Sequence, residues 1–569
     1  MPLFFFNRNS DTGEGFFGEM PAEKAFSDDP IPTGETSSYK STYESLPHHL
    51  KSCLDYIYIL LNNFYWERRK VVRLLLAQGL IQEKPGEIME DTAGDIIDEL
   101  ICLEMLREES YFESMLYVSK FYGKSCLIEV EEHDFVAKAA NSPIHGLISN
   151  NEVLPPNFKN LLIRSLFASS LRSASCYSYE SVHFSQAYLQ TVCALQFILV
   201  LDLYGNSEYL PDELGNLVHL RYLGLRYTHI KKLPHTVGNL QNLQTLEVTY
   251  TKLRHLPVEI LNIKQLRHLL LNDCKIHNDG IRVPRGIGTL VNLHTCAGVY
   301  VDAGFAIELS TLTHLRNLDV RNVSEDHASE LFVSICKLEN LVSLSLNAER
   351  TYLGTPLPEL EALCPPPHLQ ELSLRGGLFE IPNWLASIEN LTSLELRDSN
   401  LLENPSSVLQ FLPKLKHLVL DNAYKAKIIS KEFCEAGGYP ELETLLISSR
   451  DLVEWTEIVN GAFPSLKRLK FQSCHNLRFL PEDIEREKTD DSNWGNKFHL
   501  EESSSPSLRG ASFCRCEEIE IAALQLLSRG DGKKKEKLKY GVATAYTSEN
   551  GVERKEREKA GWTAAVGRE

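Results

Sequence analysis

The chain has 569 residues, of which 43% are hydrophobic, and its 77 acidic and 59 basic side chains give a formal net charge of -18. This acidic balance argues against nucleic acid or an anionic membrane as the partner, because both are bound by clustered lysine and arginine. The 13 cysteines lack the Cys-x-x-Cys spacing of a zinc site, and no apolar run approaches the roughly 20 residues of a membrane span. Since the N-terminus also lacks a signal peptide, we expect a cytoplasmic protein, with the nucleus as a second compartment, and no metal site.

The first 140 residues divide into a polar segment and a predicted helical domain. Residues 1–40 have no apolar periodicity and are predicted to be disordered. Within 41–140, helical spacing recurs in "SLPHHLKSCLDYIYILLNNF", "ERRKVVRLLLAQGLI" and "EDTAGDIIDELICLEML". A β-hairpin is predicted next, in "YFESMLYVSKFYGKSCLIEVEEHD", with its turn at Tyr122-Gly123-Lys124. Three helices followed by a hairpin is the order of a winged-helix domain.

A repeat occupies most of the remaining chain. After a predicted linker at 141–159, aligned lines begin at Leu210, Leu233 and Leu256, which sets a period of 23 residues with an L-x-x-L-x-L core. This pattern is typical of leucine-rich repeats, whose units stack because one unit cannot bury its leucines alone. We therefore predict an α/β fold, a leucine-rich-repeat solenoid (horseshoe) of about 12–13 repeats over 160–482. Residues 483–569 are predicted to be mostly disordered, with an isolated helix at 517–527.

The helical segments and the later "EEHDF" resemble the winged-helix part of plant intracellular NLR immune receptors, which join an NB-ARC domain to leucine-rich repeats. The coiled-coil-type branch of that family is the most similar. The resemblance covers residues 39–140 and then the repeat region, in the family's order. It implies a role in plant innate immunity and disease resistance.

A His-Asp pair, His133-Asp134, stands where that family has a Met-His-Asp motif. The family's histidine contacts the β-phosphate of bound ADP, so the resemblance implies that His133 and Asp134 are a nucleotide sensor or its relic. Here Glu132 replaces the methionine, and a carboxylate at this place would repel a diphosphate. From the residues alone, a general base and a helix cap formed by Asp134 remain alternatives.

The phosphate-binding loop of the family, G-x-x-x-x-G-K-[ST], is not found in the sequence. The only Gly-Lys-Ser is Gly123-Lys124-Ser125, and Val118 stands where the first glycine belongs. We therefore expect a chain truncated at the nucleotide-binding end, with no cofactor and no enzymatic activity.

The exposed positions of the repeat strands are the predicted binding site. Side chains alternate along a strand, so the third and seventh positions of L-x-x-L-x-L-x point to the same, concave face. A mixture of arginine, tyrosine and histidine suits protein recognition. The predicted protein-binding residues are Tyr222, Arg226, Thr245, Thr249, His268, Asn272, Arg321, Arg375 and Arg397.

The expected function is recognition of proteins in plant defence: a pathogen effector, a guarded host protein or a partner NLR. Residues 41–140 carry 18 acidic and 10 basic side chains, which argues against DNA binding by the winged helix. Two alternatives stay open. One is an intact ADP/ATP switch with an unrecognised nucleotide site, and the other is a leucine-rich-repeat adaptor of a ubiquitin ligase.

Overall fold

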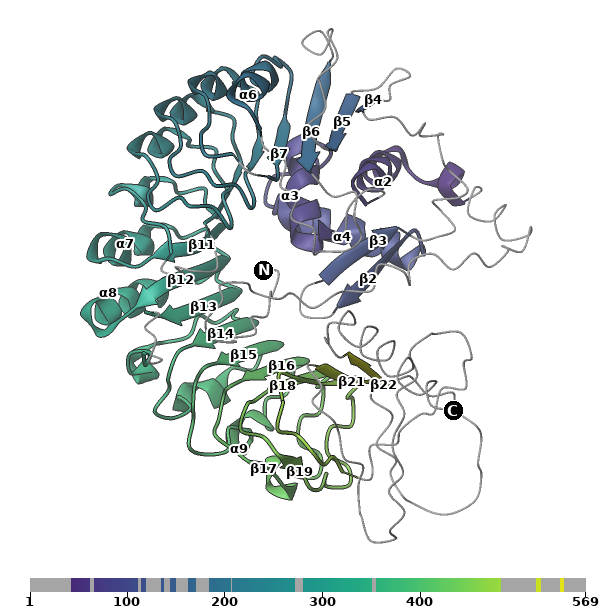
Figure 1. Ribbon diagram of the computed structural model, residues 1–569, viewed down its shortest axis with the longest axis vertical. Helices are drawn as coiled ribbons and strands as arrows, with labels where there is room; N and C mark the ends of the chain where they lie inside the picture. The colour runs from purple at the N-terminus through teal and green to yellow at the C-terminus, as the bar shows by residue number, and fades with distance from the viewer. Residues whose placement is uncertain are drawn as a thin grey trace, which may run out of the picture. The chain divides into compact units, whose positions relative to one another are not determined.

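The computed structural model describes twelve stretches of the chain, which fall into two compact units. The first unit takes in the chain up to residue 352 together with 362–368, and the second takes in 353–361 and the chain from 369 onward. Figure 1 shows the helices and strands of both. The described residues are 42–61, 66–110, 114–118, 135–137, 144–149, 162–169, 184–205, 207–271, 280–349, 355–481, 518–522 and 543–546.

The first unit begins with an N-terminal module, which we define as the described residues from 42 to 118. Its helices bury Leu54, Ile57, Leu74 and Ile97 completely, because their apolar residues recur at helical spacing. Three antiparallel strands complete it, in the order β1-β3-β2. The elements are α2 (His48–Leu61), β1 (Trp66–Glu67), α3 (Arg68–Gln78), α4 (Met89–Cys102), β2 (Leu106–Ser110) and β3 (Ser114–Val118).

A strand pair that was not predicted follows α4 directly. Strands β2 and β3 pair around residues 111–113, whereas the turn predicted at 122–124 lies outside the described residues. The third predicted helix ran to Leu106, but α4 ends at Cys102 because Glu104 takes a left-handed conformation with φ of 58°. The chain therefore reverses there, and Leu106 becomes the first residue of a strand.

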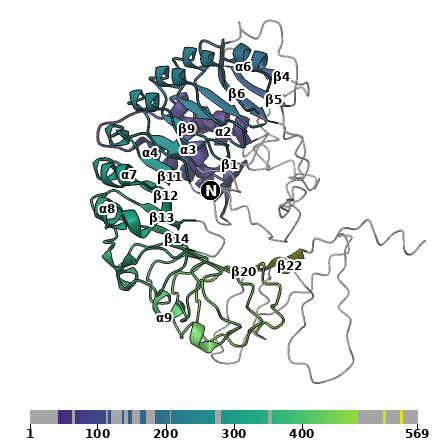
Figure 2. The same cartoon turned by 60° about the vertical axis from the view of Figure 1, so that its left-hand side comes forward.

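The repeats of the first unit form one parallel sheet, in which equivalent positions of successive repeats pair, as Leu223 does with Leu246. Figure 2 shows β11, β12 and β13 side by side. One strand, β4, joins the sheet antiparallel to β5. The strands are β4 (Phe135–Ala137), β5 (Ile144–Ser149), β6 (Ile163–Ser169), β7 (Val200–Leu203), β8 (Tyr222–Gly224), β9 (Thr245–Glu247), β10 (His268–Leu270), β11 (Thr295–Tyr300), β12 (Asn317–Val323) and β13 (Ser343–Ala348).

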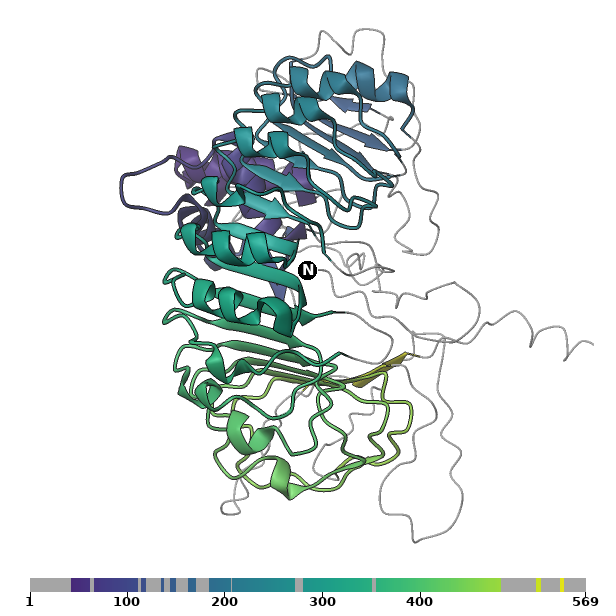
Figure 3. The same ribbon diagram turned by 90° about the vertical axis from the view of Figure 1, so that its left-hand side faces the viewer.

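Short helices return the chain between these strands and stack on each other (Figure 3). The "LGNL" glycine allows the stacking, since a Cβ on Gly215 would lie 2.6 Å from Cβ of Thr236 in the next repeat. In the turn after β8, the Thr228 hydroxyl donates to the Leu225 carbonyl at 3.0 Å. The helices are α6 (Gln186–Val192), η3 (Asp212–Asn216), η4 (His235–Asn239), η5 (Val258–Asn262), η6 (Ile287–Thr289), α7 (Ala303–Glu308), η7 (Leu309–Thr311) and α8 (Glu325–Ile335). A further short helix, η8 (Leu360–Ala362), follows β13, and its residues divide between the two units.

The second unit repeats this design with larger aromatic side chains in its core, among them Phe433, Tyr439 and Trp455. Its parallel strands are β14 (Glu371–Arg375), β15 (Ser393–Arg397), β16 (His417–Asp421), β18 (Thr444–Ser448) and β20 (Arg468–Gln472). Strands β17 (Ile428–Ile429) and β19 (Glu454–Trp455) form a separate pair. The helices are η9 (Asn383–Ser387), α9 (Ser406–Leu409) and η10 (Lys431–Phe433).

Two segments that were predicted to lack regular structure contain strands. Strand β5 lies within the predicted linker 141–159 and pairs with β6. Strands β21 (Glu518–Ala522) and β22 (Ala543–Tyr546) lie in the predicted C-terminal tail and add antiparallel strands to β20. Residues 518–522 were predicted as part of a helix, but "EIEIA" alternates with a period of two, and the open edge of β20 offers backbone groups to pair. The predicted segment 1–40 lies outside the described residues.

Candidate functional site

The N-terminal module packs on the strands of the first repeats. Helix α3 contacts β7 and β8 (Figure 1), and the core of the module continues into the sheet through Phe167 and Tyr222. The ring of Trp66 meets that of Phe167 edge-on, with centroids 5.8 Å apart. The hydroxyls of Tyr56 and Ser165 lie 3.1 Å apart in a hydrogen bond. The module and the first repeats therefore share one hydrophobic core.

A buried lysine stands at the centre of this contact. Only 2% of Lys70 is exposed, and its Nζ lies 2.8 Å from Oδ2 of Asp202 and 3.7 Å from Oε2 of Glu247. The same ammonium lies 4.1 Å from the ring centroid of Trp66, a cation–π contact. A buried cation needs such partners, because water no longer solvates it. The module thus supplies the charge that two strand residues of the repeats require.

Glu247 connects this lysine to two further side chains. Tyr222 donates its hydroxyl hydrogen to Oε2 of Glu247, and Nε of Arg226 lies 3.2 Å from Oε1. Arg226 also reaches Glu67 of the module, at 3.8 Å. Burial raises the pKa of Glu247, but the charges of Lys70 and Arg226 outweigh it, so its net pKa is lowered and it stays ionised.

A glycine makes room for the network. Gly224 lies on β8 between the strands of Asp202 and Glu247. A Cβ at this position would come within 2.1 Å of Oδ1 of Asp202 and 2.9 Å of its Cγ. Glycine is therefore required because the carboxylate that binds Lys70 lies against the backbone.

A second carboxylate of the module, Glu90 at the start of α4, meets a basic cluster on the repeats. Arg267 donates two hydrogen bonds to it, Nε to Oε1 at 2.9 Å and Nη2 to Oε2 at 2.6 Å. Nε2 of His268 lies 3.0 Å from Oε1, and Nδ1 of His294 lies 4.0 Å from Oε2. Beside this cluster, Asp91 pairs with Arg316 at 2.6 Å where both side chains are more exposed.

The ionisation states of this cluster are set by burial and by the partners. Burial raises the pKa of Glu90, but hydrogen bonds from His268 and Arg267 outweigh it, and the net pKa lies below the usual range. Burial lowers the pKa of His268, against the opposing effect of Glu90. Burial also lowers the pKa of His294, to about 4. Near neutral pH the cluster therefore contains a carboxylate, a guanidinium and neutral imidazoles.

The predicted recognition residues of the early repeats lie under this module. Tyr222 is fully buried, Thr245 is 1% exposed and His268 is 4% exposed. Arg226 and Thr249 point into the same region, since Arg226 pairs with Glu67 and Thr249 contacts Glu247. The prediction requires correction at these five positions, because their neighbours are side chains of the same chain.

The other predicted residues have partners within the repeats, or lie outside the described residues. Arg321 is buried and pairs with Asp319, with Nη2 2.9 Å from Oδ2. Arg397 is 8% exposed and pairs with Glu395 and with Asp421. Arg375 retains 30% side-chain exposure and lies 3.5 Å from Asp398. The predicted residues outside the described part are His133, Asp134 and Asn272.

The acidic partners were missed because only two of three concave positions were considered. Side-chain alternation places the fifth position of L-x-x-L-x-L-x on the same face as the third and seventh. The fifth positions hold acidic residues in four repeats, and each carboxylate binds a cation at a buried or half-buried site. These residues are Asp202, Glu247, Asp319 and Glu395.

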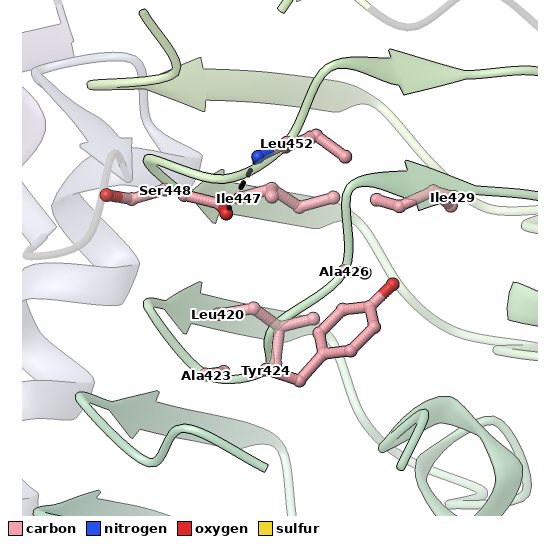
Figure 4. A pocket seen from close by; sticks show the side chains of 9 residues that line it. Leu420, Ala423, Tyr424, Ala426, Ile429, Ile447, Ser448 and Leu452 are labelled. Carbon is pink, nitrogen blue, oxygen red and sulfur yellow. Dashed lines mark hydrogen bonds between the residues drawn. The ribbon is translucent and has the colours of Figure 1, made fainter. Parts of the chain in front are cut away.

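A small apolar pocket lies in the second unit between β16 and β18 (Figure 4). Leu420, Tyr424, Ile429 and Ile447 line it, and the Leu452 amide donates to Oγ of Ser449 at 3.3 Å beside it. The room inside, about 10 Å³, is that of one water molecule, too little for a cofactor. Within the described residues there is also no cluster of His, Cys, Asp and Glu arranged for a metal ion, and no helix able to span a membrane.

The fold and the docked module define a leucine-rich-repeat protein whose early repeats are covered by a helical module. A family model described as "Leucine-rich repeat region" matches residues 171–518, and the chain belongs to this family.

Curated relatives match a larger share of the chain than the family model does. "Probable disease resistance RPP8-like protein 2" of Arabidopsis thaliana is 27% identical over 478 residues, 78% of this chain and 50% of that protein. "Disease resistance protein RPM1" of the same plant is 29% identical over 471 residues, 78% of this chain and 48% of that protein. The chain thus spans about half the length of the curated relatives it matches. A leucine-rich-repeat protein structure from Leptospira interrogans aligns with a TM-score of 0.36 and 20% identity, over 54% of this chain and 87% of that one.

Proposed function

We propose that this chain is a plant innate-immunity protein of the NLR type that recognises pathogen effectors or host proteins through its leucine-rich repeats. The disease-resistance relatives support the proposal, and so does the order of a helical module followed by repeats. Its role is binding and not catalysis. The proposed site of action is the cytoplasm, with the nucleus as a second compartment, and a paired NLR is a further candidate partner.

The observation that carries the proposal is the docking of the N-terminal module on β7 to β10 through Lys70 and Glu90. In this arrangement the early repeats bind the module of their own chain. We therefore assign recognition to the strands of the second unit, where Glu371, Arg375 and Lys470 are half-buried and alternate with buried leucine and phenylalanine side chains. Arginine and aromatic side chains at such positions dominate many protein interfaces.

The proposal includes no nucleotide switch within residues 1–569. The phosphate-binding loop is not found in the sequence, and His133 lies outside the described residues. The test is to denature the purified chain and quantify released ADP and ATP against protein. We expect none; near-stoichiometric ADP would require a nucleotide site and make His133 its sensor.

The recognition surface is tested by charge reversal in the second unit. A panel of secreted pathogen proteins and host proteins is measured for binding to the wild-type chain by surface plasmon resonance. For any specific binder, Arg375→Glu with Lys470→Glu is expected to weaken binding at least tenfold. The matched control, Lys414→Glu with Lys431→Glu, changes the net charge equally on exposed residues away from the strands, and is expected to leave binding unchanged. Equal binding by the two double variants would move the recognition surface elsewhere.

A further inference from the structure

Two cysteines of neighbouring repeats lie against each other in the first unit. Cys336 is the C-terminal cap of α8, and Cys364 follows η8. The thiol of Cys336 points at the backbone of Cys364, with Sγ 3.4 Å from the carbonyl oxygen. Both are free thiols, and the two side chains also interact with each other. The geometry brings together two cysteines that are 28 residues apart in the sequence.

Their surroundings differ in a way that assigns different roles. Cys364 is exposed, and Cys336 is half-buried. Burial raises the pKa of Cys336, so its thiol stays protonated near neutral pH and reacts slowly alone. Oxidants in solvent therefore reach Cys364 first, with Cys336 positioned directly beside it.

The backbone holds Cys364 in place. Residues 365–367 are three prolines, each of which fixes its own φ angle and restricts the residue before it. On the other side, the amide of Cys336 donates to the carbonyl of Phe332 in the last turn of α8, and the next amide, of Lys337, donates to the carbonyl of Ser334. The two sulfurs are therefore carried by restrained segments, which favours reaction between them over reaction with a distant thiol.

We propose that Cys336 and Cys364 form a reversible intramolecular disulfide when the protein meets a peroxide, which makes this pair a redox modification site. The other described cysteines differ from it: Cys53, Cys193, Cys296, Cys434 and Cys474 are buried, and Cys102 is exposed on α4. Neither cysteine is among the residues that dock the module or among those proposed to recognise a partner.

The chemistry balances with hydrogen peroxide as the oxidant. The Cys364 thiolate attacks one peroxide oxygen, the O–O bond breaks, a sulfenic acid forms, and hydroxide leaves and takes up the thiol proton as water. The sulfur of Cys336 then attacks that of Cys364; the S–S bond forms, the S–O bond breaks, and a second water leaves with the proton of Cys336. Two thiols and one peroxide thus give one disulfide and two waters, and a dithiol reductant restores the thiols.

The disulfide would close a loop from residue 336 to residue 364. Cross-linking restricts the unfolded chain, so we expect the first unit to be harder to unfold when oxidised. It would also fix residues 362–368, the last stretch of the chain assigned to the first unit, to the end of α8. Peroxide would in this way stabilise the C-terminal border of that unit.

The full-length protein is treated with micromolar to millimolar hydrogen peroxide, blocked with N-ethylmaleimide, digested with trypsin and analysed by mass spectrometry. Cleavage after Arg321, Lys337, Arg350 and Arg375 leaves the two cysteines on separate peptides, 322–337 and 351–375. We expect these peptides to appear as one disulfide-linked species, which dithiothreitol reduces to the two separate peptides. This should occur at peroxide doses at which most of Cys102 is still alkylated by N-ethylmaleimide.

Two variants distinguish the roles. In Cys336→Ser, Cys364 is expected to stop at a sulfenic acid that dimedone traps. In Cys364→Ser, Cys336 is expected to remain a thiol, and Cys102→Ser is the control that keeps the linked peptide. The proposal is overturned if the wild type gives no linked peptide while Cys364 advances to sulfinic or sulfonic acid. It is equally overturned if Cys336 pairs with other cysteines as often as with Cys364.

Discussion

The repeats of the two units share one sequence pattern but neutralise their strand charges differently. In the first unit, Asp202 and Glu247 receive their cation from Lys70, which belongs to the N-terminal module. In the second unit, Arg397 lies among Glu395 and Asp421 of its own and the next strand. Arg397 of the second unit is therefore paired within the repeats, whereas Asp202 of the first depends on a segment about 130 residues earlier in the chain.

This difference predicts which unit depends on a distant residue for its stability. A buried ion pair that loses one partner leaves an uncompensated charge, which costs far more than the pair contributes. Loss of Lys70 should thus destabilise the first unit, and loss of a charge in the second unit should have a more local effect.

The largest effect is expected from Lys70→Met. It removes the cation between Asp202 and Glu247 and should lower the stability of the first unit by about 3–5 kcal/mol, the range for breaking a buried pair. Urea unfolding followed by the fluorescence of Trp66, in a chain whose other four tryptophans are replaced by phenylalanine, measures it. Adding Asp202→Asn and Glu247→Gln should recover much of the loss, because neutral amides no longer require a cation. A Lys70→Met protein as stable as wild type would show that the module does not dock as described.

The next largest effect is expected from Gly224→Ala. The new Cβ would overlap the carboxylate of Asp202, so Asp202 and Lys70 must shift, at a cost of about 1–3 kcal/mol. Gly94→Ala in α4 is the matched control, since its nearest neighbour is a side-chain atom 3.7 Å away and alanine favours a helix. The urea midpoint of the first unit is the measurement. Equal midpoints for the two variants would contradict the close approach at β8.

A smaller effect is expected from pH. The pKa of His294 is about 4 in the folded protein against an ordinary 6.5, so between these values the unfolded chain binds more protons and stability falls as pH falls. The lowered pKa of Glu90 acts in the same direction, below about 4.5. For one titrating group, the free energy of unfolding changes by less than about 1.4 kcal/mol per pH unit.

Thermal unfolding of the first unit measured from pH 7 to pH 5 tests this dependence. His294→Gln should flatten the upper part of the curve, whereas His219→Gln, at an exposed position, should not. A first unit that is equally stable at pH 7 and pH 5 would count against a neutral, buried His294.

The smallest effect is expected from Asp91→Asn. Its pair with Arg316 lies at the rim of the docking contact, where the side chain of Asp91 is 55% exposed. Exposed pairs contribute about 0–1 kcal/mol, so the unfolding free energy of the variant should lie within that margin of the wild-type value. The difference between the two should be smaller still in 1 M salt, which screens the pair. A loss as large as that of Lys70→Met would mean that the rim is desolvated in solution.

The repeat architecture could be predicted because its cause is local and recurrent. Leu220, Leu223 and Leu225 return every 23 residues and are all buried. The helices of the N-terminal module were also evident from apolar spacing. Strand β2 was not predicted because a single left-handed residue, Glu104, ends α4 early, and no periodicity indicates such a residue.

The sequence by itself determined which side chains point to the concave face, because strand alternation depends only on position in the repeat. Tyr222 and Arg375 were assigned to that face by the same rule. Only the tertiary structure decided what covers each of them. Tyr222 lies under the N-terminal module and Arg375 remains half-exposed, because docking depends on Lys70 and Glu90 meeting charges far along the chain. The 23-residue repeat pattern does not predict a contact between residues 70 and 202.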